Sequence, residues 1–216
     1  MSEAKVARVD QSKLRESVYA ALSDAFTRGA FAPSEAVSLR GLADQLGTSL
    51  TPVREAVRRL VAEGALVDTP SRTLAVAPFD AGRMAELKAA RLVLELLLLD
   101  WAAPRIEAAD IDRLRAIIAT PGLCGGRPDL KLNHEFHFTL YAAAGSDVIL
   151  PLVQALWLQY GAYLNLVVQT EAAAAVAEHE HHAEIVAALS AGDLPAARAA
   201  LTADIERSFD LLGGHQ

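Results

Sequence analysis

The stretch Gly47–Leu60, which reads GTSLTPVREAVRRL, decides the fold of the N-terminal third of this 216-residue chain. A glycine turn leads into a segment in which Val53, Val57 and Leu60 recur at the three- and four-residue spacing of one helix face. The pattern predicts an amphipathic helix over about 51–64, with an apolar stripe that faces a core.

The outer face of this predicted helix is basic, and its first turn carries small hydroxyl side chains. Arg54 and Arg58 lie one turn apart on that face, Ser49 and Thr51 lie at the start, and Thr51 is the expected N-cap. A recognition helix places such N-terminal residues at base edges, while its arginines reach guanine or phosphate. An ordinary amphipathic helix with a solvated basic face has the same periodicity, so the spacing alone leaves both interpretations open.

The elements predicted around this helix complete a known layout. They are helices at 12–29 and 38–46, strands at 66–67 and 74–76, and a turn at 69–72. Three helices followed by a two-stranded hairpin form a winged helix-turn-helix, a DNA-binding fold. We therefore predict a winged helix-turn-helix domain over residues 12–79, preceded by a flexible N-terminus at 1–11.

The remainder of the chain, residues 80–216, changes in character to long helices with no strand signal. Prolines and glycines separate six segments with helical apolar spacing. These segments are 80–103, 107–119, 129–144, 147–170, 172–191 and 194–212. Six helices with short connections predict an antiparallel bundle whose interior can hold a pocket, so the predicted fold class is mainly α.

Charge and composition limit the class of protein. The net charge is −7, but residues 1–79 hold ten Lys and Arg against nine Asp and Glu, whereas residues 80–216 hold ten against eighteen. A near-neutral domain can still bind DNA where its arginines cluster, because the local potential governs contacts with phosphate. The single cysteine, Cys124, excludes an internal disulfide, and no apolar run approaches the ~20 residues that span a membrane. We expect a cytoplasmic protein with no membrane partner.

The N-terminal sequence resembles the GntR family of bacterial regulators. The resemblance rests on Leu42–Gly47 (LADQLG), Thr51–Leu60 (TPVREAVRRL) and Glu63–Val67 (EGALV). It favours the recognition-helix interpretation and implies that operator DNA contacts the start of the second helix, the start of the recognition helix and the wing tip. The implied DNA-binding residues are Arg40, Ser49, Thr51, Arg54 and Arg72, with Arg58 as a weaker candidate. Leu50 stands where the family usually has arginine, so the operator preference is expected to differ from that of close relatives.

The second part resembles the all-helical ligand-binding domain of the FadR branch of this family, the FCD domain. The motifs that carry the resemblance are Arg91–Glu95 (RLVLE), Phe136–Leu140 (FHFTL), His182–Ile185 (HAEI) and Gly192–Ala197 (GDLPAA). Six helices indicate the VanR-like subdivision. Domains of this kind serve for effector binding and dimerisation, and many members hold a divalent metal between one Asp and three His residues.

The resemblance implies a metal site at the corresponding positions, Asn133, His137, His182 and Asp204. Asn133 replaces the family's carboxylate and Asp204 replaces one of its imidazoles, so the charge of the set is preserved. Helix geometry agrees, because Asn133 and His137 are four residues apart and His182 shares an apolar stripe with Ile185. These ligands would suit zinc, nickel or manganese. The alternative is a polar pocket without metal.

Arg91 and Glu95 lie one turn apart on the first helix of the predicted bundle. In relatives the equivalent arginine lies near the pocket and binds a ligand carboxylate, which implies that Arg91 and Glu95 bind the effector. The alternative is an i, i+4 ion pair on the surface. Trp157, Tyr160 and Tyr163 either line the same cavity or pack in the core.

Together these features predict a ligand-responsive transcriptional regulator. Two subunits are expected to pair through their bundles and to present two recognition helices to a palindromic operator on double-stranded DNA. A small organic acid is expected to release this repressor from a metabolic operon. The alternatives are a metal-dependent enzyme built on the His-rich bundle and a regulator with a vestigial, metal-free pocket. Since nothing in the sequence supplies a positioned base beside a nucleophile, no enzymatic activity is predicted.

Overall fold

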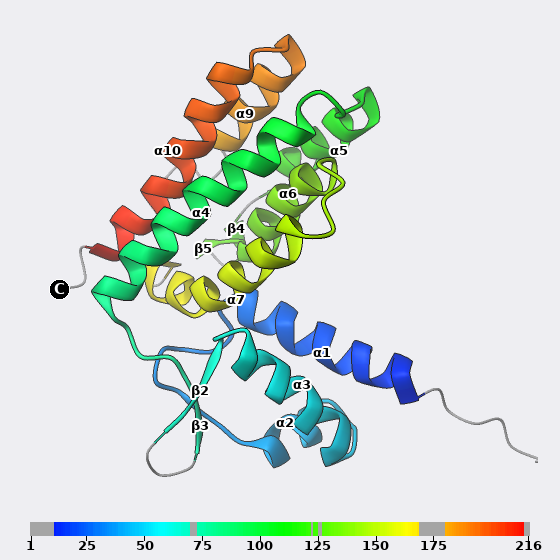
Figure 1. The fold of residues 1–216 in the computed structure, drawn as a ribbon, viewed down its shortest axis with the longest axis vertical. Coiled ribbons are helices and arrows are strands. Elements are labelled where there is room, and N and C mark those ends of the chain that lie inside the picture. Colours follow the sequence, from blue (N-terminus) through cyan, green and yellow to red (C-terminus); the bar gives the residue numbers. More distant parts are fainter. Residues whose placement is uncertain (1–10, 70–72, 122, 125–126, 169–179, 214–216) are drawn as a thin grey trace, which may run out of the picture.

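Three helices and a small sheet form the N-terminal part of the molecule, at the bottom of Figure 1. The computed structural model describes the chain except for residues 1–10, 70–72, 122, 125–126, 169–179 and 214–216. The N-terminal elements are α1 (Gln11–Thr27), β1 (Ala36–Val37), α2 (Leu39–Gln45), α3 (Leu50–Ala62), β2 (Leu66–Asp68) and β3 (Leu74–Val76). The predicted hairpin is confirmed, since β2 and β3 pair antiparallel with Leu66 opposite Val76.

Local details of this part differ from the prediction. A third strand, β1, pairs with β3 and gives the strand order β1-β3-β2. Two residues are too few to produce an alternating pattern, which is why the sequence did not reveal β1. The recognition helix α3 begins at Leu50 with Ser49 as its N-cap, so the predicted cap at Thr51 was wrong. Pro52 still falls within the first turn, where its missing N–H breaks no intrahelical hydrogen bond.

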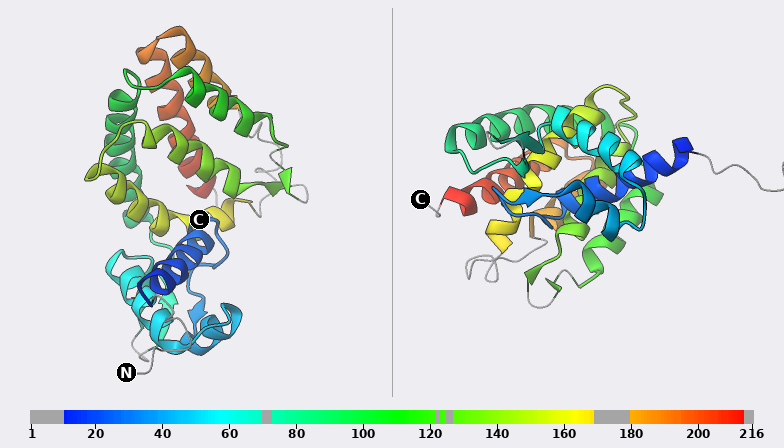
Figure 2. Two further views of the ribbon diagram at one scale, coloured as in Figure 1. Left: turned by 90° about the vertical axis from the view of Figure 1, so that its right-hand side faces the viewer. Right: turned by 90° about the horizontal axis from the view of Figure 1, so that it is seen from below.

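The second part is an antiparallel bundle of helices, at the top of Figure 1 and of the left view of Figure 2. Its helices are α4 (Ala81–Ala102), α5 (Ala108–Ala119), α6 (Leu130–Ala142), α7 (Ile149–Val168), α9 (Glu180–Ala191) and α10 (Leu194–Gly213). The winged helix-turn-helix with a helical bundle is therefore confirmed, although residues 172–179 of one predicted helix lie outside the described residues. Among the described residues, no helix has the length and apolar character needed to cross a membrane.

One short hairpin interrupts the helical character of the bundle. β4 (Leu123–Cys124) pairs antiparallel with β5 (Arg127–Pro128) in the connection between α5 and α6. The expectation that no strand follows residue 80 was therefore wrong. Each strand has two residues, which again is too short for the alternation by which a strand is recognised in a sequence.

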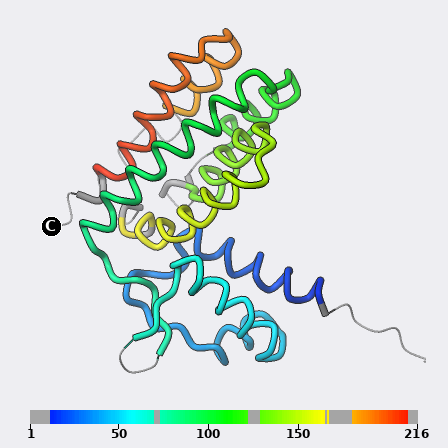
Figure 3. Tube along the Cα trace, viewed as in Figure 1, coloured from blue at the N-terminus to red at the C-terminus, as the bar shows by residue number. Residues whose placement is uncertain are grey.

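Two apolar cores hold the molecule together, and helix α7 contributes to both of them. The larger core fills the bundle, and Trp157 and Tyr160 of α7 belong to it. The smaller core lies between α1, α2, α3 and the sheet, yet it includes Leu158 and Ala162 of the same helix. The trace in Figure 3 shows α7 running between the bundle and α1. The two parts of the chain are therefore packed against each other through α7.

Candidate functional site

The expected DNA-binding surface contains three arginines that form no ion pair within the described part of the chain. Arg40 of α2 and Arg54 and Arg58 of α3 are exposed, and none of them forms an ion pair with another described residue. Arg59 differs, because its Nε lies 3.0 Å from Glu63 Oε1 and its guanidinium covers the ring of Tyr19 at 3.6 Å. The charges of these three arginines are therefore available to a binding partner such as DNA, whereas Arg59 holds α3 against α1.

The N-terminus of α3 carries the other predicted DNA contacts. Ser49 and Thr51 are exposed there, beside the first backbone N–H groups of the helix, which form an anion-binding end. Leu50 is also exposed, which leaves an apolar side chain among these polar groups. Arg72 lies outside the described residues, so its predicted DNA contact is not tested. Beside that segment, the backbone N–H of Thr69 donates to the Thr73 carbonyl. The DNA-binding roles of these residues stay predictions.

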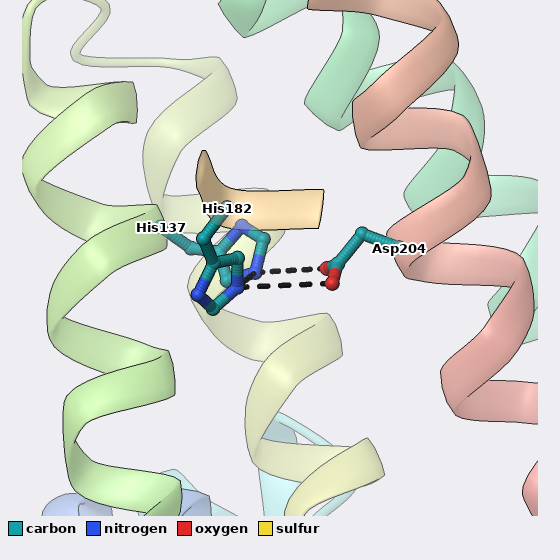
Figure 4. Close-up of side chains that lie close together, drawn as sticks. All are labelled: His137, His182 and Asp204. Atoms are coloured by element: carbon teal, nitrogen blue, oxygen red, sulfur yellow. Dashed lines mark hydrogen bonds and ion pairs between the residues drawn. The ribbon is translucent and has the colours of Figure 1, made fainter. Parts of the chain in front are cut away.

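In the bundle, three of the four predicted metal ligands converge at one point. His137 of α6, His182 of α9 and Asp204 of α10 are buried, and their ligand atoms all lie within 4.8 Å of one another. His137 Nε2 is 3.1 Å from Asp204 Oδ2, and His182 Nε2 is 3.7 Å from Asp204 Oδ1 (Figure 4). We call these three residues the His/His/Asp cluster.

The spacing within the His/His/Asp cluster fits a metal ion. Donor atoms bound to one tetrahedral zinc at about 2.0–2.2 Å lie roughly 3.3 Å from one another. The distances to the Asp204 carboxylate are 3.1 and 3.7 Å, and the two histidine Nε2 atoms are 3.3 Å apart. Three nitrogen and oxygen ligands also match the number of protein ligands in a site that keeps an open position. The residues present therefore fit zinc or a similar divalent ion.

Asn133, the fourth predicted ligand, lies on α6 four residues before His137 and is half-buried. A side chain at this position is on the same face of the helix as His137. Asn133 thus remains a predicted ligand beside the three residues that form the cluster.

Arg91 and Glu95 form a buried ion pair rather than a surface pair. The Arg91 side chain is 2% exposed and the Glu95 side chain 0%, and Arg91 Nε donates to Glu95 Oε1 over 2.6 Å. The alternative of an exposed i, i+4 pair was therefore wrong. Trp157 Nε1 also donates to Glu95 Oε1, over 3.0 Å. Burial alone would lower the pKa of Arg91. The charge of Glu95 and its hydrogen bond outweigh that effect and raise the pKa above its ordinary value, so the guanidinium stays charged.

One polar atom of this pair has no hydrogen-bond partner among the described residues. Arg91 Nη1 is buried and has no hydrogen-bond partner in the described part of the chain. The guanidinium lies over aromatic faces, with its Cζ 4.4 Å from the ring of Trp157, 4.7 Å from Tyr160 and 5.6 Å from Phe209. Trp157 and Tyr160 thus belong to the surroundings of Arg91. Tyr163 instead donates to the Pro78 carbonyl over 2.9 Å, near the connection between the two parts of the chain.

Tyr141 joins the Arg91–Glu95 pair to the His/His/Asp cluster. Its hydroxyl donates to Glu95 Oε2 over 2.5 Å, and it lies 3.1 Å from His137 Nδ1. Burial and the neighbouring Glu95 raise the pKa of Tyr141 well above its ordinary value, so the hydroxyl keeps its proton. Because that proton goes to Glu95, the tyrosine oxygen accepts the Nδ1 proton of His137. In a neutral His137, the Nε2 lone pair then points at Asp204 and His182.

The charge of Asp204 is the other requirement of a metal site. Burial would raise the pKa of its carboxyl group, but the hydrogen bond and positive charge that His137 supplies when its Nε2 carries a proton, together with His182 and Arg207, lower it below its ordinary range. Asp204 is therefore a carboxylate, which faces the Nε2 atoms of both histidines. A lone pair of His137 beside a carboxylate is repulsive unless a proton or a metal ion lies between them.

The sequence did not single out Tyr141 or Arg207, although both complete the site. Tyr141 is four residues after His137 and Arg207 is three after Asp204, so each lies on the same helix face as a predicted ligand. That spacing was the available signal. Arg207 Nη2 lies 3.4 Å from Asp204 Oδ1.

Both parts of the chain match known protein families. Residues 14–76 match "Bacterial regulatory proteins, gntR family", and residues 86–207 match "FCD domain". The HTH-type transcriptional regulator McbR of Escherichia coli (strain K12) is 26% identical over 189 residues, 85% of this chain and 86% of that protein. An uncharacterized HTH-type transcriptional regulator in an unstable DNA locus of Streptomyces ambofaciens is 30% identical over 204 residues, 91% of this chain and 84% of that protein. The solved structure of E. coli McbR/YncC has a TM-score of 0.86 at 25% identity, covering 96% of this chain and 99% of the other.

Proposed function

Because this chain belongs to the GntR family of bacterial regulatory proteins and carries an FCD domain, it is a DNA-binding transcriptional regulator and not an enzyme, and we propose that it represses a metabolic operon until a small organic acid binds inside the helical bundle. The proposal has three parts: a carboxylate effector, a metal ion in the His/His/Asp cluster and a homodimer on operator DNA in the cytoplasm.

The unpartnered Arg91 Nη1 carries the proposal of a carboxylate effector. A buried donor without an acceptor costs about 1–3 kcal/mol, so a ligand that supplies an acceptor gains that energy on binding. A guanidinium matches a carboxylate in shape and charge better than it matches other ligands. The aromatic rings around Arg91 provide an apolar wall for the carbon skeleton of a small acid.

The metal proposal rests on the His/His/Asp cluster. His137, His182 and Asp204 would hold the ion, with Asn133 as the proposed fourth ligand. When bound, such an ion supplies a positive charge with positions open to an oxygen ligand. Tyr141 and Glu95 fix the ring of His137 so that its Nε2 faces the other two residues. The same hydrogen bonds connect the cluster to Arg91 through Glu95.

An effector regulates DNA binding only if its affinity differs between the DNA-binding conformation and another one. The DNA for this experiment is a duplex that the protein selects from a pool of random sequences. We expect small mono- and dicarboxylates, titrated in the presence of zinc, to weaken binding of the protein to that duplex. The coupling expected for such a regulator is about 5–150-fold in the DNA dissociation constant. Unchanged affinity with every carboxylate would instead support a vestigial pocket.

Replacement of Arg54 by alanine tests the DNA-binding surface. Arg54 is exposed on α3 and forms no ion pair with the described residues, so its loss should leave the fold intact. We expect affinity for the selected duplex to fall by about 1–3 kcal/mol, or roughly 5–150-fold, with relaxed specificity. Fluorescence anisotropy at fixed salt measures the change. Arg115→Ala removes the same charge from the bundle surface and should leave affinity unchanged; equal affinity of the Arg54 variant would contradict the assignment.

The partly exposed apolar face of α4 is the proposed dimer interface. Leu92, Val93, Leu96 and Leu97 line a surface hollow of about 370 Å³, edged by the Asp100–Arg198 ion pair. Exposed apolar patches of this kind mark contacts with other proteins. A second copy is the proposed occupant, because one copy has one recognition helix and a palindrome needs two, related by a two-fold axis.

A lysine at Val93 should prevent this dimer. Val93 is 67% exposed, so Val93→Lys costs the single subunit little but would bury a charge in a two-fold interface. We expect sedimentation to show a monomer and the selected palindrome to bind more weakly. Val148→Lys is the matched control, because Val148 is 71% exposed, lies just before α7 and does not line the hollow on α4. A Val93→Lys protein that remains a dimer would place the interface elsewhere.

A further inference from the structure

We infer that helix α7 carries the state of the effector site to the DNA-binding part, and that Arg83 and Gln159 are the positioning residues that fasten α7 to the end of the recognition helix. The inference rests on the proposed function and names the path by which its two sites communicate. Three groups of contacts support it.

On its bundle side, α7 contacts the effector site directly. Trp157 donates its indole hydrogen bond to Glu95, and the ring of Tyr160 lies 4.7 Å from the Cζ atom of Arg91. A ligand that draws Arg91 away from Glu95 therefore changes the packing of two large side chains of α7. Since interiors are close-packed, such a change shifts the helix rather than being absorbed locally.

On its opposite side, α7 is packed into the DNA-binding part. Leu158 and Ala162 belong to the apolar core formed by α1, α2 and α3. Gly161 lies against the end of α1 so closely that a Cβ there would be 2.2 Å from the Phe26 carbonyl oxygen and 2.8 Å from Thr27 Cα. Backbone contact this close leaves no flexible side chain to take up a displacement, so α1 and α7 must move together.

Two side chains bind the end of α3 to this assembly. Arg83 Nη2 donates to the Gly64 carbonyl over 3.0 Å and to Gln159 Oε1 over 2.7 Å. Gln159 Nε2 in turn donates to the carbonyl of Glu63, over 2.9 Å. Glu63 is the C-cap of α3, and Gly64 follows with φ +78°. We call Arg83, Gln159 and these two carbonyls the α3 clamp.

The α3 clamp suits this task chemically. The last carbonyls of a helix lack intrahelical partners, and a cation near them is favourable because of the helix dipole. Both donor groups of the clamp come from outside the DNA-binding part, Arg83 from the start of α4 and Gln159 from α7. The recognition helix is thus oriented by the two helices that also carry Arg91, Glu95, Trp157 and Tyr160.

Coupling is reciprocal, so DNA can serve as the probe in place of the effector. The protein contains two tryptophans, Trp157 at the effector site and Trp101, which is 40% exposed on α4. In protein labelled with 5-fluorotryptophan, a selected duplex should displace the ¹⁹F signal of Trp157 by more than its line width. The exposed Trp101 is identified by its shift between H₂O and D₂O and serves as the reference.

The clamp variants Arg83→Met and Gln159→Leu provide the test. We expect both to bind the duplex within about tenfold of the wild-type dissociation constant, yet to lose more than half of the Trp157 displacement. Gln154→Leu is the matched control, because Gln154 is an exposed glutamine of the same helix outside the clamp, and it should keep the full displacement.

The possible results separate this inference from the proposed function. A wild-type protein that binds DNA without moving the Trp157 signal would overturn the inference alone, as would clamp variants that keep the full displacement. A protein that selects no duplex would overturn the proposed function, and the inference with it.

Discussion

Replacement of Glu95 by alanine is expected to lower the free energy of unfolding by about 3–5 kcal/mol, because it leaves a buried charge without its partner. Glu95 accepts hydrogen bonds from Arg91, Trp157 and Tyr141, and all four side chains are buried. The substitution removes one acceptor side chain and leaves three donor side chains without it, one of them a guanidinium. Urea unfolding followed by circular dichroism measures the loss.

The matched control removes both charges at once. In the double variant Arg91→Leu, Glu95→Leu neither charge of this pair remains buried, and such replacements are often neutral or stabilising. We therefore expect it to recover most of the stability that Glu95→Ala loses, while the response to carboxylates disappears. If Glu95→Ala unfolds at the wild-type urea concentration, the ion pair does not hold the bundle together and Arg91 has another partner in solution.

Helical spacing predicted the recognition helix but not the state of its arginines. The pattern of Val53, Val57 and Leu60 identified the buried face of α3, and all three are buried. The same pattern puts Arg54, Arg58 and Arg59 outside. Only the structure shows that Arg59 is held by Glu63 and Tyr19, because Tyr19 belongs to another helix, far away in the sequence.

The Arg91–Glu95 pair shows why local spacing could not decide burial. A separation of four residues is the same for a surface pair and for a buried one. What distinguishes the two is a set of partners distant in the chain: Tyr141 and Trp157 lie 46 and 62 residues from Glu95. Such contacts depend on how α4, α6 and α7 pack, and no periodicity within one helix contains that information.

The His/His/Asp cluster was predicted from family resemblance, with limited help from spacing. His182 shares an apolar stripe with Ile185, and both are buried, so the spacing indicated that the histidine points inward. The convergence of α6, α9 and α10 could not be derived from any single segment. The link through Tyr141 was not foreseen either, and it makes one network of what the sequence suggested were two separate groups.

Saturating zinc is expected to stabilise the purified protein strongly if the His/His/Asp cluster holds the ion. At a free concentration of 1,000 times its dissociation constant, a ligand that binds only the folded state adds about 4 kcal/mol to the free energy of unfolding. For a chain of this size that corresponds to a rise of roughly 8–16 °C in the melting temperature. Metal analysis should show one ion per chain, and a chelator should reverse the shift.

The controls for zinc separate the cluster from incidental binding. His182→Ala should abolish the rise in melting temperature while sparing DNA binding in the presence of chelator, because His182 lies in the bundle. His181→Ala, which removes the neighbouring histidine paired with Glu184, should leave the rise unchanged. Asn133→Asp tests the fourth position: a carboxylate there should tighten zinc binding if Asn133 is a ligand.

Acidity provides a further check on the same site. The ligands must be deprotonated to bind, so protons compete with zinc, and the stabilisation should decline as the pH falls through the range in which histidines become charged. The lowered pKa of Asp204 keeps its carboxylate ionised through that range, so protonation of Asp204 would not cause the decline. A melting temperature that changes with neither zinc nor chelator at any pH would contradict the metal site. Arg91 alone would then have to recognise the effector.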